Sequence, residues 1–156
     1  MALATKAPQP TPDPELYETD YYAWLMHNAA LIRAGRASEA DLENIAEELE
    51  DTGRSEKRAL GSHFVVLLQH LLEWQRQPKR CSNSWRLSID NARDAIDELL
   101  GEGPTLRRRV PELIEGKFPL ARRNAITVTG LPDSGVPETY PFTPEQVLDP
   151  SDWPEQ

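Results

Sequence analysis

The chain has 156 residues, a net charge of −9 at pH 7 and a single cysteine. This length suits one domain with a buried core, and one cysteine excludes an intramolecular disulfide and any zinc site built from several cysteines. The sequence shows neither a secretory signal pattern nor an apolar run of the roughly 18–20 residues that a membrane span requires. We therefore expect a cytoplasmic protein with no membrane partner.

The amino-terminal region predicts a disordered leader followed by a helix. Residues 1–12 are rich in alanine and proline and cannot bury much apolar area. Asp13 precedes Pro14 as an N-cap precedes a proline in the first helical turn, and the helix should end at Gly35. Asn28 falls near the middle of its apolar stripe, where a buried amide needs partners. This amide either fixes the register of the packed helices or offers a polar group to a ligand pocket.

The second helix is predicted to be long and central. Ser38 and Asp41 resemble a capping box at its start, and the apolar residues then keep one helical phase through Gly53 and Gly61. Each interior glycine costs about 0.5–1 kcal/mol relative to alanine, yet the phase favours one helix over two. The second half of this helix is apolar around most of its circumference, and Glu73 is assigned to a narrow polar strip.

A polar turn should separate the long helix from a third helix. Asn83 or Ser84 is expected to cap the third helix, because short polar side chains satisfy the first backbone N–H groups. Its apolar residues recur on one face. Arg93 is expected on the opposite, outer face, in a pair with Asp97 one turn further on.

A fourth helix and a proline-rich tail complete the prediction. Pro111 suits the first turn of the fourth helix, Val128 belongs to its inward stripe, and Gly130 suits its carboxyl end. Residues 131–156 contain too many prolines for a helix throughout and too many apolar residues for a free linker. We expect this tail to pack on the bundle, with a short helix capped by Thr143.

The sequence thus predicts an all-α fold. A single-domain bundle of four main helices occupies residues 13–130, its second helix is long and central, and the extended tail covers it. No alternating pattern is long enough to make a sheet.

Charge is segregated along the chain, because residues 53–93 are basic overall and both flanking segments are acidic. We interpret the basic block as a partner for acidic helices, within the fold or in another copy. Net negative charge makes nucleic acid an unexpected partner. The candidate basic contact surface comprises Arg54, Lys57, Arg58, Lys79, Arg80 and Arg86.

Polar residues on the helices define a candidate site. His63 and His70 lie about 10.5 Å apart along a helix axis and cannot share one ion. His70 and Glu73 are three residues apart and could bind a metal with a carboxylate from another helix. The simpler interpretation is a hydrogen-bonded histidine and a solvated acidic face, so no catalytic residue, metal ligand or cofactor is assigned. The candidate polar site comprises Asn28, Glu43, Glu47, Glu48, His70 and Glu73.

A family resemblance rests on five stretches, YETDYYAWL, DLENIAEELEDTGRSEKRAL, LLQHLLEWQRQP, SWRLSI and PFTPEQVLD. Together they resemble a bacterial family known as domain of unknown function family 29, over about residues 15–154. The resemblance implies an all-helical fold and no activity, substrate or catalytic residue. The chain departs from the family pattern at Glu73, where a lysine is usual, so the resemblance does not imply a metal pair with His70. Matching positions include Trp24, Asn44, Glu47, Glu48, Gly53, Arg54, His70, Trp74, Pro78 and Trp85.

These observations favour a non-enzymatic helical module for protein interaction or self-association, with another protein or a second copy as partner. One alternative is a metal-dependent helical-bundle enzyme with a His/Glu site. The other is a nucleic-acid-associated protein that acts through the basic central segment.

Overall fold

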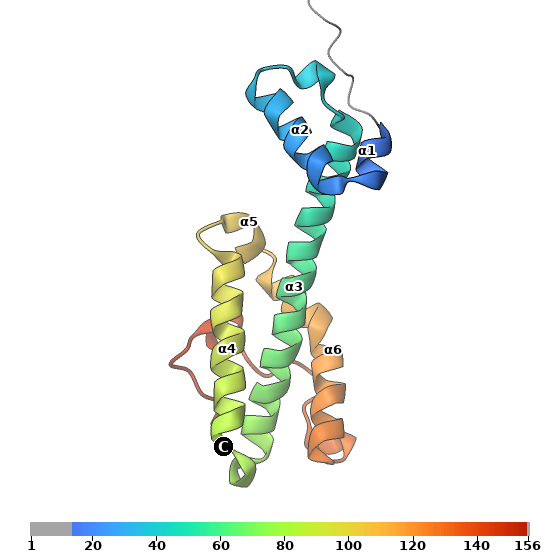
Figure 1. Cartoon of the computed structure of the whole chain (residues 1–156). Coiled ribbons are helices and arrows are strands. Elements are labelled where there is room, and N and C mark those ends of the chain that lie inside the picture. Colours follow the sequence, from blue (N-terminus) through green and yellow to red (C-terminus); the bar gives the residue numbers. More distant parts are fainter. Residues whose placement is uncertain (1–13, 156) are drawn as a thin grey trace, which may run out of the picture. The chain divides into compact units, whose positions relative to one another are not determined.

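The computed structural model describes residues 14–155, and every regular element in that range is a helix (Figure 1). The all-α prediction is therefore confirmed. The chain divides into an amino-terminal unit that ends at Gly53 and a carboxy-terminal unit that begins at Arg54, and each is described by itself. The predicted leader and the Asp13 cap lie outside the described residues. Within residues 14–155, no helix combines the length and the apolarity that a bilayer crossing demands.

The amino-terminal unit begins with two helices where one was predicted. The chain breaks at Asp20, whose carboxylate accepts a hydrogen bond from the backbone N–H of Ala23 at 3.1 Å and caps the second helix. Gly35 follows this helix with a φ of +72°, a conformation that suits glycine. The elements of the unit are α1 (Pro14–Thr19), α2 (Tyr21–Arg33), the 3-10 helix η1 (Ala37–Glu39) and the first part of α3 (Leu42–Arg76).

Helix α3 continues through Gly53 and Gly61, as the phase of its apolar residues predicts. The predicted capping box at its start is wrong. Ser38 lies in η1, and Asp41 immediately precedes α3, with its carboxylate accepting a bond from the backbone N–H of Asn44 at 3.4 Å. An aspartate in this position takes the capping role because its side chain reaches an otherwise unpaired N–H group.

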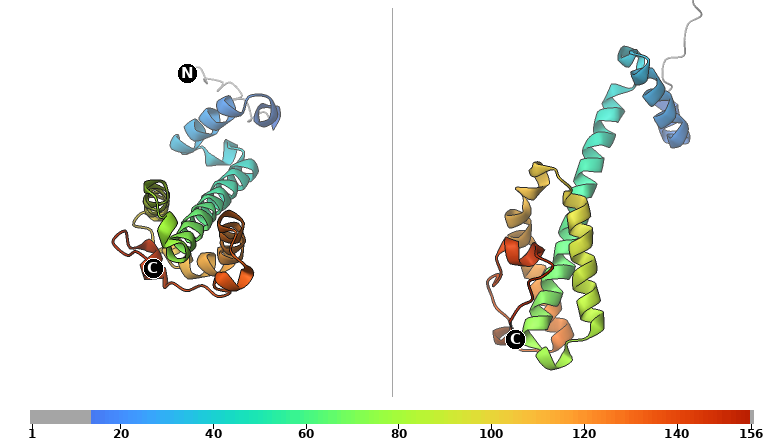
Figure 2. Two further views of the ribbon diagram at one scale, coloured as in Figure 1. Left: turned by 90° about the horizontal axis from the view of Figure 1, so that it is seen from below. Right: turned by 90° about the vertical axis from the view of Figure 1, so that its left-hand side faces the viewer.

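The carboxy-terminal unit is a helical bundle in which α4 and α6 lie on either side of α3 (Figures 1 and 2). Ser82 caps α4 by accepting a bond from the backbone N–H of Trp85 at 3.2 Å, so the predicted caps Asn83 and Ser84 lie one and two residues too late. Gly130 ends α6 with a φ of +68°, as predicted. The elements after α3 are η2 (Pro78–Arg80), α4 (Asn83–Leu100), α5 (Pro104–Arg107), α6 (Val110–Thr129), η3 (Asp133–Gly135) and α7 (Pro144–Leu148).

One continuous apolar core fills this bundle. The second half of α3 contributes leucines and Phe64 from one broad face, whereas Val66 on the same stretch is 41% exposed. The tail contributes Val136, Phe142 and Val147 to the same core. Val128 was predicted to face inward but is 54% exposed, because the buried stripe of α6 ends with Ala125.

Arg93 is the clearest error of the sequence-based prediction. Its side chain is 4% exposed and points into the bundle, where three carbonyl groups of the tail accept its hydrogen bonds. Nε donates to the carbonyl of Val147 at 2.9 Å, and Nη2 donates to those of Gln146 at 3.1 Å and Asp152 at 2.9 Å. The first two carbonyls belong to the last turn of α7, which carries a partial negative charge. Those carbonyls are a better partner for a guanidinium than the exposed Asp97.

A second arginine holds the beginning of the tail. Nε of Arg122 donates to the carbonyl of Pro137 at 2.8 Å, and Nη2 donates to that of Asp133 at 2.7 Å. Further along, the rings of Trp74 and Trp153 lie 4.7 Å apart. The predicted short helix is α7, whose capping box joins Thr143 to Gln146. The tail is thus an ordered part of the carboxy-terminal unit, and three of its side chains are buried in the core.

Candidate functional site

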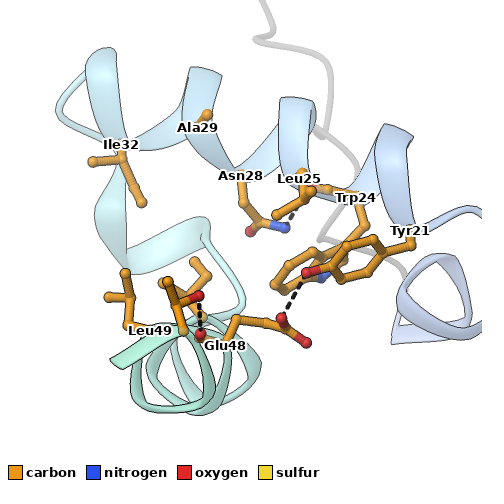
Figure 3. A pocket seen from close by; sticks show the side chains of 10 residues that line it. Tyr21, Trp24, Leu25, Asn28, Ala29, Ile32, Glu48 and Leu49 are labelled. Carbon is orange, nitrogen blue, oxygen red and sulfur yellow. Dashed lines mark hydrogen bonds between the residues drawn. The ribbon is translucent and has the colours of Figure 1, made fainter. Parts of the chain in front are cut away.

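An apolar groove of about 390 Å³ opens in the amino-terminal unit, between α2 and the part of α3 that belongs to this unit (Figure 3). This volume lies in the range of small-molecule and peptide pockets. Most of the lining is hydrocarbon or aromatic, with one carboxylate at the edge. The lining residues are Tyr21, Trp24, Leu25, Asn28, Ala29, Ile32, Ile45, Glu48, Leu49 and Thr52.

Trp24 forms the floor of the groove and is 1% exposed. The ring of Tyr17 meets it edge to face at a centroid distance of 4.8 Å, and the ring of Tyr21 stacks on it at 5.8 Å. Its indole N–H donates to the carboxylate of Asp41 at 3.1 Å. Aromatic pairs in these arrangements contribute about 0.5–1.5 kcal/mol beyond the area that they bury. The indole is therefore fixed before any partner arrives.

Asn28 joins the two helices of the groove. Its side-chain N–H donates to the carbonyl of Trp24 at 2.9 Å, and its side-chain oxygen accepts from the backbone N–H of Asp41 at 2.8 Å. The residue is 2% exposed, so both bonds form away from water. The amide thereby ties α2 to the residue that immediately precedes α3, and it also lines the groove.

Glu48 gives the groove its one charged contact. Its two carboxylate oxygens accept hydrogen bonds from the hydroxyl groups of Tyr17 at 2.5 Å and Tyr21 at 2.6 Å. Figure 3 shows the bond from Tyr21. These hydrogen bonds lower the pKa of Glu48 and raise the pKa of Tyr17 to about 12, with the pKa of Tyr21 raised for the same reason. The carboxylate is fixed in its ionised form and already has two donors.

Asp41 plays a similar part at the start of α3. Its carboxylate accepts the side-chain N–H of Asn44 at 2.8 Å as well as the indole N–H of Trp24. The bond from Asn44 and then that from Trp24 lower the pKa of Asp41, against the opposing effect of burial. Polar bonds, rather than a deep apolar core, therefore hold the groove in shape.

The amino-terminal unit leaves much of its apolar surface open. Among its described side chains, the buried apolar ones are Trp24 and Leu31. Large apolar side chains stay exposed on both helices, and two of them, Leu49 and Ile32, line the groove. The most exposed are Tyr22 at 72%, Leu49 at 69%, Leu42 at 54%, Met26 at 51% and Ile32 at 46%.

The residues of the candidate polar site fall into both units. Asn28 and Glu48 line the groove, and Glu43 and Glu47 are exposed on the same stretch of α3. His70 and Glu73 belong to the carboxy-terminal unit. Over residues 14–155, no three histidine, cysteine or acidic side chains are grouped as a metal ion would require.

Glu73 was predicted on a polar strip but its side chain is fully buried. Its two oxygens accept the side-chain N–H of Gln69 at 2.8 Å and contact Nδ1 of His70 at 2.8 Å. A carboxylate at this depth needs such partners, because an unpaired buried charge is costly. His70 and Glu73 therefore each have a polar partner on α3 itself.

The six residues of the candidate basic surface gather in three places. Arg54, Lys57 and Arg58 border one hollow of the carboxy-terminal unit, and Lys79 and Arg80 border another at η2. The guanidinium of Arg86 lies 5.0 Å from the centre of the Trp153 ring and so contacts the tail.

Sequence reasoning missed the groove itself. It treated the apolar stripe around Asn28 as buried, and it treated the apolar residues of the next helix as one helical phase. The structure leaves part of this surface open, because the unit holds too few elements to cover both stripes. The groove could have been predicted from residues 14–53, because this segment has more apolar residues than its few helices can cover.

The fold and groove define an all-helical protein whose amino-terminal unit carries an open apolar groove. The model of the Domain of unknown function DUF29 family matches residues 16–153, and the chain belongs to that family, as its sequence resemblance predicted. Comparison with curated proteins and with solved structures finds no match.

Proposed function

We propose that this chain is a non-enzymatic interaction module of the bacterial cytoplasm, and that it self-associates by placing part of a second copy in the amino-terminal groove. The observation that carries this proposal is the open apolar groove over a rigid aromatic floor. Interfaces are built in this way, with aromatic and apolar anchors at the centre and polar residues at the rim.

The exposed apolar side chains set the strength of the association. Burying the exposed half of five such side chains contributes about 1 kcal/mol each. Association costs at least about 4 kcal/mol in lost translational and rotational freedom. Apolar burial thus offsets the lower end of that cost, and complementary charges must add to it. The expected complex is reversible and depends on salt concentration.

Charge favours a second copy as the occupant. Glu48 places a carboxylate at the edge of the groove, and Glu43 and Glu47 are exposed on the same stretch of α3. A partner for this rim should carry basic residues, and the carboxy-terminal unit of the same chain exposes Lys79, Arg80 and Arg86. In a two-fold dimer each copy contributes one groove and one basic surface, so every favourable contact occurs twice.

Analytical ultracentrifugation across a range of protein concentrations tests this proposal. Wild-type protein should show a reversible dimer that weakens as salt rises. Leu49→Glu places a like charge beside the acidic rim and removes an exposed apolar contact, so it should weaken dimerisation at least ten-fold. Val128→Glu is the matched control, because Val128 is 54% exposed on α6 and is not one of the residues that line the groove.

Circular dichroism should show the same helix content in both variants, because each replaces an exposed side chain. A monomer at all concentrations and salt levels would contradict the proposal. Equal weakening by Leu49→Glu and Val128→Glu would also contradict it, since the effect would then not come from the groove.

A further inference from the structure

We infer that the carboxy-terminal unit carries a separate binding site for a phosphate-class dianion, formed by α3 and α6. A hollow of about 310 Å³ lies there, lined by Arg54, Lys57, Arg58, Leu113 and Lys117. Four of these five residues are cationic, in a chain whose net charge is −9. This inference does not depend on the proposed self-association.

Helical spacing brings the cations together. Arg54, Lys57 and Arg58 follow the three- and four-residue steps that place side chains on one face of α3. Leu113 and Lys117 are four residues apart and share a face of α6. The two faces meet at the hollow, so cations from two different helices approach the same volume.

Gly61 fixes where Lys117 lies. This glycine is buried on α3, and a Cβ atom built there would lie 2.7 Å from Cε of Lys117 and 3.5 Å from its Nζ. The lysine stem therefore crosses α3 over the space that an alanine side chain would fill. A glycine inside a helix costs about 0.5–1 kcal/mol relative to alanine. The close approach of Lys117 gives a physical reason for a glycine at this position.

Glu112, next to Leu113 on α6, is bonded chiefly to Arg109. Arg109 donates to Glu112 at 2.9 Å, and this bond is the largest cause of the lowered pKa of Glu112, with Lys57 contributing more weakly. Among the described residues, Lys57, Arg58 and Lys117 take part in no ion pair. Arg58 and Lys117 line the hollow without an ion pair, and Lys57 interacts only weakly with Glu112, so positive charge is in excess there and an anion relieves the repulsion.

The geometry favours a compact dianion over a nucleic-acid strand. The cations surround one hollow, whereas a strand needs contacts distributed along its backbone. Arginine and lysine together suit a tetrahedral phosphoryl group, since the guanidinium offers paired N–H donors and the ammonium a point charge. Free phosphate and a phosphate monoester share this chemistry. Leu113 adds a small apolar wall that the organic part of an ester would contact.

Isothermal titration of the full chain with inorganic phosphate is the first measurement. Binding should be saturable, with one site per chain, and should exceed any signal from sodium chloride at the same ionic strength. A sugar phosphate provides the second arm: equal affinity assigns the site to the free ion, and tighter binding assigns it to an ester. A phosphodiester oligonucleotide that binds more tightly than both would contradict the inference.

Two charge variants locate the site. Lys57→Gln combined with Lys117→Gln removes a cation from each helix and should weaken phosphate binding at least ten-fold. Lys79→Gln combined with Arg80→Gln is the matched control, because it removes the same charge from the exposed η2 turn and should change binding less than two-fold. Equal weakening by both pairs would show a non-specific effect of net charge and would overturn the inference.

Gly61→Ala tests the arrangement without changing any charge. The new Cβ displaces only the end of a flexible lysine stem, and alanine favours a helix, so the fold should be retained. Phosphate affinity should fall at least three-fold as the ammonium moves. An unchanged affinity in a folded Gly61→Ala protein would show that Lys117 does not contribute, which also counts against the site.

Discussion

The two units of this chain hold their helices together in different ways. The carboxy-terminal unit packs helices and tail around a continuous apolar core, in which Phe64, Leu67 and Ile96 are completely buried. The amino-terminal unit buries two apolar side chains among its described residues, Trp24 and Leu31. It relies instead on hydrogen bonds to Asn28, Asp41 and Glu48 and on stacked aromatic rings.

This difference explains where a partner surface remains. A core that already covers its apolar residues leaves little apolar surface for a partner, whereas a small unit with few helical elements cannot cover both of its apolar stripes. Polar bonds fix the geometry of the amino-terminal unit without covering Leu49 or Ile32. The groove is thus a consequence of the unit's small size as well as of its sequence.

The largest expected effect comes from the apolar core. Phe64→Ala removes a fully buried ring and should lower the free energy of unfolding of the carboxy-terminal unit by about 3–5 kcal/mol. Urea unfolding followed by tryptophan fluorescence measures it, since Trp74, Trp85 and Trp153 all belong to this unit. Val66→Ala is the control, because Val66 is 41% exposed on the same helix and should cost less than about 1 kcal/mol.

A smaller, local effect should follow from Asn28→Ala. The change removes two hydrogen bonds and leaves the backbone N–H of Asp41 without its partner, which costs about 1–3 kcal/mol. Hydrogen exchange should speed up in residues 14–53 and stay unchanged in the core of the carboxy-terminal unit. Met26→Ala, at an exposed position of the same helix, should leave both patterns nearly as in wild type. Equal loss of protection in both units would contradict the conclusion that the polar bonds of Asn28 stabilise the amino-terminal unit alone.

The smallest effect is the pH dependence that the bond between Tyr17 and Glu48 gives to the amino-terminal unit. The pKa of Tyr17 is raised from its ordinary value of 10.0 to about 12 in the folded protein. The bond from Tyr17 to Glu48 therefore contributes its full stability below pH 10.0, and this stability is lost as the pH rises through the folded pKa. The lowered pKa of Glu48 adds stability above its ordinary value of 4.5, and this is lost as pH falls through the lower folded value.

Phenolate absorbance checks the alkaline side of this prediction. The difference between wild-type and Tyr17→Phe titrations isolates one phenol, which should ionise near pH 12. This subtraction also removes Tyr140, whose pKa is raised by burial in the other unit. A difference curve with its midpoint near pH 10 would show that the bond between Tyr17 and Glu48 does not persist in solution.

Periodicity predicted much of the carboxy-terminal unit correctly. The phase of the apolar residues predicted that α3 continues through Gly53 and Gly61. Thr143 was predicted to cap the beginning of α7, and Gly130 to mark the end of α6. Such features depend on residues close in sequence, so a single sequence contains the information. Asp20 was missed as a helix boundary because the apolar stripe continues across it in nearly the same phase.

The periodicity of the sequence could not predict the buried charged side chains or the groove. Arg93 and Glu73 were placed at the surface because charged residues are usually exposed, and their partners decide otherwise. Gln69 and His70 lie within one turn of Glu73, but the carbonyl partners of Arg93 lie more than fifty residues away in sequence. The groove depends on the absence of a covering element, which local patterns do not report.

The tail held by Arg93 and Arg122 has a consequence for synthesis of the protein. Val136, Phe142 and Val147 belong to the core, and the carbonyl of Asp152 is one of the three that accept bonds from Arg93. On the ribosome, α4 and α6 are complete while these residues are still inside the exit tunnel. The carboxy-terminal unit therefore reaches its final packing only after its last turns emerge, and a chain terminated early exposes an apolar surface that chaperones and proteases recognise.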